Sequence, residues 1–125
     1  MPNQKADVIY RAFESKVQKL RPPGVRVEVR KLAASDPVLI DTSSNVVKSA
    51  SAVVRAVWGT DPVYTREGGT IPIVSKFVSA LKVPIILFGF GLPDDGHHAP
   101  NEKMNLNHFF KGIDTVIRFI EGIAQ

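Results

Sequence analysis

The most constraining feature of this sequence is a nearly continuous apolar run from Val83 to Phe90, VPIILFGF. The run is too short to cross a bilayer, which needs about 18 apolar residues or more. It is typical of a strand that is buried on both faces of a mostly parallel sheet. A polar loop follows at residues 91–102, and apolar residues then recur at helical spacing from Leu106 to Ile120. The sequence therefore predicts a buried strand, a polar loop and a last helix in one layered unit.

Helical and extended patterns alternate along the rest of the chain. Helical spacing of apolar residues covers Ala6–Leu20, Val46–Val57 and Ile73–Leu81. Apolar and charged residues alternate over residues 25–30, and Val63–Thr65 form a second short strand candidate. Strands that alternate with helices give an α/β fold with right-handed crossovers. We therefore expect the fold class to be α/β, with part of a mostly parallel sheet and flanking helices.

A segment rich in turn formers and helix caps, residues 33–45, indicates a boundary between two units. Residues 1–33 carry 8 basic and 3 acidic side chains, whereas residues 34–125 carry 8 and 9. The basic side chains of the first unit are spaced like the wet faces of a helix and a strand, with few aromatic residues between them. We therefore expect a solvated face, and no nucleic-acid partner.

The composition limits the chemistry and the compartment. The chain has no cysteine, which excludes a disulfide framework, a thiolate zinc site and a cysteine nucleophile. Any metal site must use carboxylates and the three histidines, His97, His98 and His108. The first residues are polar, and no apolar signal segment follows them. We therefore expect a cytoplasmic protein without a membrane partner.

Two polar clusters follow strand candidates, where open α/β sheets bind their ligands. The first cluster, residues 66–70, places two glycines and a hydroxyl at the start of a helix. Unpaired backbone N–H groups and the helix dipole favour a carboxylate or another anion at such a position. The same residues also suit an ordinary turn in which Thr70 caps the helix.

The second cluster, residues 91–102, concentrates acidic and imidazole groups after the apolar run. Asp94 and Asp95 could bind a metal, act as acid and base, or close the loop through hydrogen bonds to the backbone. His97 and His98 could ligate zinc, although adjacent histidines in one loop do not supply the four ligands of a closed site. The glycines at 89, 91 and 96 have no phosphate-loop spacing.

Three strings of residues resemble the C-terminal signatures of the dizinc metallopeptidases, the family of cytosolic nonspecific dipeptidase, carnosinase, aminoacylase and succinyl-diaminopimelate desuccinylase. The strings are REGGTIP at 66–72, GFG at 89–91 and DDGHHAPNEK at 94–103. The order and spacing of these strings resemble those of the dipeptidase branch of the family. The resemblance covers nearly the whole chain. The resemblance implies part of a small α+β lid or dimerisation domain at residues 1–33, a return linker at 34–42, and the C-terminal part of the catalytic domain at 43–125.

The resemblance also implies roles for individual residues of the loop. His98, which Ala99-Pro100 separate from Asn101-Glu102, is implied as a zinc ligand. Asn101, Glu102 and Asp95 are implied to support the loop that carries His98, without ligating the metal themselves.

The resemblance implies that the first polar cluster, residues 66–70, binds substrate. The turn residues that hold the C-terminal side of the substrate are Gly68, Gly69 and Thr70. Arg66 either shapes the substrate pocket or pairs with a loop carboxylate, Asp94 or Asp95. The implied reaction is amide hydrolysis by a metal-bound hydroxide, with a dipeptide or an N-acyl amino acid as substrate.

Departures from the family pattern limit what this chain does alone. A complete site of the family uses two zinc ions, with manganese or cobalt as alternatives, and five ligand side chains, of which this chain supplies one. No residue of the chain is implied as the catalytic base. We therefore expect a C-terminal portion of a peptidase that is inactive in isolation. The alternative is a non-catalytic dimerisation or binding module, which forms a homodimer through an edge at Val25–Leu32.

Overall fold

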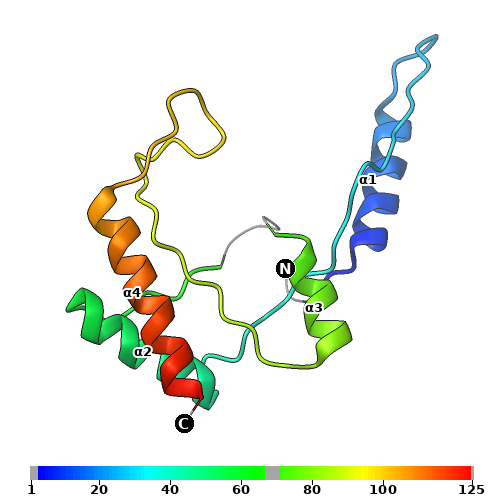
Figure 1. The fold of residues 1–125 in the computed structure, drawn as a ribbon. Coiled ribbons are helices and arrows are strands. Elements are labelled where there is room, and N and C mark those ends of the chain that lie inside the picture. Colours follow the sequence, from blue (N-terminus) through cyan, green and yellow to red (C-terminus); the bar gives the residue numbers. More distant parts are fainter. Residues whose placement is uncertain (1–2, 67–70, 125) are drawn as a thin grey trace. The chain divides into compact units, whose positions relative to one another are not determined.

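The computed structural model describes residues 3–66 and 71–124 (Figure 1). Four α-helices lie in these ranges: α1 (Ala6–Leu20), α2 (Asn45–Trp58), α3 (Ile73–Leu81) and α4 (Leu106–Ile123). The helices predicted from apolar periodicity are confirmed. None of the helices in the described ranges is long and apolar enough to span a membrane.

The predicted α/β fold is wrong for the described residues, because they contain no strand and no sheet. The apolar run at 83–90, the alternating segment at 25–30 and residues 63–65 are all coil. Among the described residues, no backbone hydrogen bond joins any two of these segments. The same correction applies to the predicted α+β character of residues 1–33, where helix α1 is followed by coil. A strand needs a neighbour to pair its N–H and C=O groups, and apolar patterning does not supply that neighbour.

The chain divides into two compact units that are each built from two stretches of sequence. Unit 1 comprises Met1–Leu39 and Arg66–Ile85, and unit 2 comprises Ile40–Thr65 and Ile86–Gln125. The division predicted from the sequence, at residues 33 and 43, remains a prediction about the chain's domains.

In unit 1, helix α1 is held to the coil that follows it by side chains that bond the coil's carbonyl groups. The hydroxyl of Tyr10 donates to the carbonyl oxygen of Val29 at 3.0 Å, and Nε2 of Gln18 donates to that of Val27 at 3.0 Å. These two hydrogen bonds join α1 to the carbonyl groups of Val27 and Val29, which are two positions apart in the coil. The alternation that suggested a strand therefore serves a helix–coil contact.

Two ion pairs complete this attachment and make it sensitive to acid. Lys5 pairs with Asp36 at 2.9 Å, the N–H of Ala6 donates to the same carboxylate at 3.1 Å, and Lys31 pairs with Asp7 at 2.5 Å. The hydrogen bond from Lys5 lowers the pKa of Asp36, and the hydrogen bond from Lys31 lowers the pKa of Asp7. Both carboxylates favour the attached state while they are ionised.

We expect the attachment of α1 to loosen as the pH falls below about 4. A carboxyl group with a lowered folded-state pKa stabilises the folded state above its unfolded pKa, near 3.8 here, and that stabilisation is lost as the pH falls through the folded pKa. Amide NMR spectra of residues 27–31 between pH 6 and pH 2 should show one transition. The Asp7→Asn, Asp36→Asn double variant should give the loosened spectrum already at pH 6. Identical spectra of variant and parent at pH 6 would contradict this.

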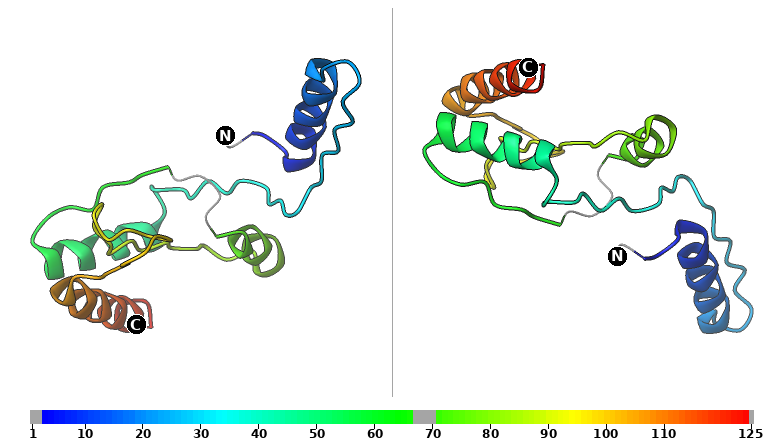
Figure 2. Two further views of the ribbon diagram at one scale, coloured as in Figure 1. Left: turned by 90° about the horizontal axis from the view of Figure 1, so that it is seen from above. Right: turned by 90° about the horizontal axis from the view of Figure 1, so that it is seen from below.

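In unit 2, helices α2 and α4 pack against each other, side by side in both views of Figure 2. Val47 and Ala50 of α2 are buried, as are Gly112 and Thr115 of α4. Burial at this contact is limited, because large apolar residues of α4 stay exposed. These are Leu106, Phe109, Phe110, Ile113, Val116, Ile117, Ile120 and Ile123.

The exposed surface of the chain is large for its mass. The accessible area is 10239 Å², compared with about 6,600 Å² for a compact monomer of 13.7 kDa. Many large apolar side chains are exposed, and extensive exposed apolar surface marks sites of association. The chain on its own therefore leaves many of its large apolar side chains unburied.

Candidate functional site

The site is built on the coil between Phe90 and helix α4, residues 91–105, which we call the His98 loop. Asp95 lies at its neck and is only 2% exposed. Its carboxylate accepts the N–H of Leu92 at 2.7 Å, and its carbonyl oxygen accepts the N–H of Lys103 at 2.9 Å. The side chain and backbone of Asp95 thus join the two arms of the loop, and its carboxylate is used in shaping the loop.

A surface ion pair reinforces the same neck. Nζ of Lys103 lies 2.8 Å from Oδ2 of Asp94. The hydrogen bond from Lys103 lowers the pKa of Asp94, and the same contact raises the pKa of Lys103. Asp95 therefore closes the loop through a hydrogen bond to the backbone, which is one of the alternatives that the sequence left open, whereas Asp94 pairs with the side chain of Lys103.

His98 lies at the far end of the loop and is exposed. It adopts a left-handed backbone conformation with φ of 60°, as does Asn101 with φ of 63°. Such values are uncommon outside glycine and tend to occur at functional positions. The N–H of Ala99 donates to the carbonyl oxygen of Gly96 at 2.9 Å, which forms the turn around His98. The loop therefore presents the His98 imidazole to solvent from a defined turn.

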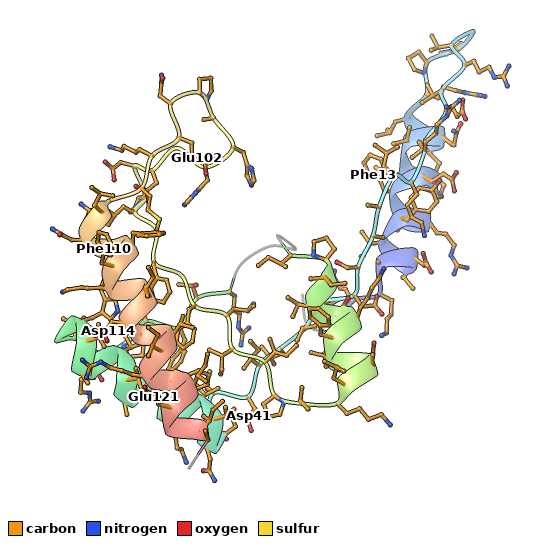
Figure 3. The ribbon with its side chains drawn as sticks, in the orientation of Figure 1. Phe13, Asp41, Glu102, Phe110, Asp114 and Glu121 are labelled. Carbon is orange, nitrogen blue, oxygen red and sulfur yellow. The ribbon has the colours of Figure 1, made fainter. Side chains whose placement is uncertain are left out.

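His97 and Glu102 are neighbours across the loop, where Figure 3 labels Glu102. Nδ1 of His97 lies 3.4 Å from Oε1 of Glu102. The ring of His97 also covers Gly91, because a β-carbon at Gly91 would lie 2.8 Å from Nε2 of His97. The structure thus places Glu102 beside His97, while the side chain of His98 makes no such contact with the described residues of the loop.

The remaining predicted site residues lie on the other side of the apolar run in the sequence. Arg66 is exposed and lies in coil. Gly68, Gly69 and Thr70 lie outside the residues that the structure describes. Their roles in substrate binding remain predictions.

The residues of the loop fit one position in a metal site. Within residues 3–66 and 71–124, no group of three or more His, Asp or Glu side chains is placed to hold a metal ion. His98 offers an exposed imidazole, which is a common zinc ligand, whereas Asp94, Asp95 and His97 each have partners in the loop. On this donor set, the described part of the loop offers an imidazole without a loop partner and no complete set of metal ligands.

An aromatic cluster at the base of the His98 loop was not found from the sequence. Trp58, the last residue of α2, stacks on Phe90 with ring centroids 5.7 Å apart and meets the edge of His108 at 5.0 Å. Its Nε1–H donates to the hydroxyl of Thr115 at 2.9 Å, and this fully buried hydroxyl donates to the carbonyl oxygen of Lys111. The signal in the sequence was the pair Gly112 and Thr115, two small residues three positions apart that are both buried in α4.

Comparisons with known proteins give a consistent result. The model of peptidase family M20/M25/M40 matches residues 2–122. The Cys-Gly metallodipeptidase DUG1 of Saccharomyces cerevisiae is 38% identical over 77 residues, which are 62% of this chain and 16% of that protein. The human Beta-Ala-His dipeptidase is 35% identical over 77 residues, 62% of this chain and 15% of that protein.

A solved structure is similar over nearly all of the chain. It is described as the structural and mechanistic basis of substrate recognition by the di-peptidase Dug1p from Saccharomyces cerevisiae. The TM-score is 0.78 at 28% sequence identity, and the match covers 95% of this chain and 26% of that one. The chain therefore spans between 15% and 26% of the length of these relatives.

Proposed function

Because the chain belongs to the dipeptidase branch of peptidase family M20/M25/M40, we propose that it is the C-terminal portion of a zinc-dependent dipeptidase that hydrolyses an amide bond. The observation that carries the proposal is the His98 loop, which presents the exposed imidazole of His98 and is closed at its neck by Asp95 and Lys103. The proposed substrate is a dipeptide, the substrate class that the names of these relatives give, with an N-acyl amino acid as the alternative that the sequence resemblance implies. The proposed compartment is the cytoplasm.

In the proposed enzyme, His98 binds one of two zinc ions through a neutral ring nitrogen. When bound, zinc polarises the scissile carbonyl and supplies a nucleophile from water at neutral pH. Asp95 and Lys103 keep the loop closed at its neck, so that the imidazole is delivered from a fixed turn. Manganese or cobalt could serve in place of zinc.

Substrate binding is assigned in this proposal to the first polar cluster, residues 66–70. Backbone N–H groups near Gly68, Gly69 and Thr70 are proposed to bind the carboxylate at the C-terminal side of the substrate. Arg66, which is exposed, adds a positive charge to this end of the site. In this assignment, residues 1–33 belong to a lid, residues 34–42 return the chain, and residues 43–125 belong to the catalytic domain.

The isolated chain is proposed to be inactive, because its described residues offer no complete ligand set. A dimerisation module is the second candidate. It is favoured by exposed apolar residues on and after α1, namely Val8, Ile9, Phe13, Leu20 and Val25. A homodimer is proposed in either case.

Complementation tests the enzyme proposal. The chain would be co-expressed with the part of Saccharomyces cerevisiae Cys-Gly metallodipeptidase that precedes its similar segment, and the purified complex would be assayed for Cys-Gly hydrolysis with zinc or manganese. We expect hydrolysis by the pair, none by either part alone, and none when the chain carries His98→Ala. A stable complex that does not hydrolyse the dipeptide, or that hydrolyses it equally well with His98→Ala, would contradict the proposal.

A further inference from the structure

His108 joins the two ends of the His98 loop. Its backbone N–H donates to Oδ1 of Asn105, the residue that caps α4, at 3.2 Å. Its ring atom Nδ1 lies 3.1 Å from the carbonyl oxygen of Phe90, the last residue before the loop. A carbonyl oxygen only accepts, so Nδ1 of His108 carries the proton and donates. One residue thus holds the beginning of the loop to its end.

The aromatic cluster keeps this connection in place. The ring of Phe90 stacks on Trp58 and lies close to the backbone of Gly112, where a β-carbon would come within 2.8 Å of it. Trp58 also contacts the ring of His108 edge-on and is itself fixed by the hydrogen bond to buried Thr115. Because both partners of the His108 bond are packed, the bond forms between groups that have little freedom to separate.

We propose that His108 is a positioning residue for His98, in that it ties the ends of the His98 loop together and so holds the imidazole at a fixed place relative to α4. This inference rests on the proposed role of His98 as a metal ligand. His108 itself binds the carbonyl of Phe90, and it does not ligate the metal. Partners that orient a metal ligand commonly change metal affinity by about 10- to 100-fold when they are replaced.

Three variants separate the hydrogen bond from the packing. His108→Phe keeps a ring against Trp58 and removes the donor to Phe90. His108→Asn places an amide N–H close to the position of Nδ1 and keeps the donor. Asn107→Ala, at the exposed neighbouring position of α4, is the matched control.

Hydrogen exchange of the full 125-residue chain, read by mass spectrometry, tests the anchoring. His108→Phe should raise exchange of the loop peptide 91–105 about fivefold, which corresponds to the loss of one net hydrogen bond, and leave the peptide 113–123 of α4 unchanged. His108→Asn and Asn107→Ala should behave like the parent chain. No change in the loop, or an equal rise in α4, would overturn the inference.

Zinc affinity, measured on the complex of this chain with the preceding part of the yeast dipeptidase, tests whether loss of the His108 bond weakens metal binding. His108→Phe should weaken zinc binding about tenfold, and His108→Asn should restore it. Equal affinities of the parent and His108→Phe would overturn the positioning role while His98 stays a ligand. If His98→Ala leaves zinc binding unchanged, the proposed function itself fails, and with it the purpose of the anchor, whatever the exchange data show.

Discussion

We expect His98→Ala, introduced into the complemented complex, to lower kcat for dipeptide hydrolysis by more than about a hundredfold and to remove one zinc ion per site. Replacing a partner that merely orients a ligand already costs about 10- to 100-fold, so loss of the ligand itself should cost more. His98 is exposed and outside the hydrogen bonds that close the loop neck. The change should therefore leave the loop folded, and the lost rate should report the metal.

His97→Ala is the matched control for this prediction. His97 is adjacent, carries the same side chain, and lies against Gly91 and Glu102. Its replacement should leave the zinc content at the parent value and reduce kcat far less than His98→Ala does. Metal analysis and steady-state kinetics of both variants decide the matter. If His97→Ala loses the zinc and His98→Ala keeps it, the ligand has been assigned to the wrong histidine.

Gly112→Ala should destabilise unit 2 by about 1–3 kcal/mol, the usual cost of overpacking a filled core. In a helix interior, alanine normally stabilises by up to about 1 kcal/mol relative to glycine. At Gly112 a β-carbon would lie 2.8 Å from Cδ2 and 3.1 Å from Cγ of Phe90. The ring also stacks on Trp58 and on Phe88, so these contacts would have to adjust if it moved away from α4.

Gly122→Ala provides the opposite case in the same helix. A β-carbon at Gly122 would meet no atom within 4 Å, so this substitution should be neutral or stabilising. Urea unfolding of unit 2, followed by the fluorescence of Trp58, would measure both variants. The two free energies of unfolding should differ in sign relative to the parent chain. A Gly112→Ala variant that is as stable as Gly122→Ala would show that Phe90 does not press on α4.

The helices could be predicted from the sequence because the information that specifies them is local. Helix α4 repeats its apolar residues at helical spacing and begins at Asn105, whose side chain accepts the N–H groups of Asn107 and His108. Helix α2 ends at Gly59, which takes the left-handed conformation that favours glycine. Each of these signals lies within a few residues of the structure that it determines.

The strands could not be predicted correctly because pairing is not local. The run at 83–90 has the composition of a buried strand, yet no backbone group of another described segment bonds to its backbone. Residues 27–29 alternate as an edge strand would, yet their carbonyls receive Tyr10 and Gln18 of α1. A pattern of side chains records which residues avoid water, and it does not identify the neighbour that covers them.

The candidate site also combines features with a local sequence signal and contacts between residues that are far apart in the sequence. The motif at 94–103 pointed to His98, and the closing role of Asp94 and Asp95 was among the alternatives that their turn chemistry allowed. The contact of His108 with Phe90 joins residues 18 positions apart. No spacing rule reaches over that distance, so the anchor of the loop required the packed structure of α2 and α4.

Calorimetric titration of Zn²⁺ into the metal-free 125-residue chain tests most directly whether this chain carries one ligand of a larger site. We predict that the chain binds Zn²⁺ weakly, with a Kd between about tens of micromolar and millimolar, as expected for one or two imidazoles. The His98→Ala variant should bind Zn²⁺ more weakly still. Tight stoichiometric binding that His98→Ala abolishes would mean that the chain builds a complete site by itself or with a second copy. That result would contradict the account of an incomplete peptidase portion.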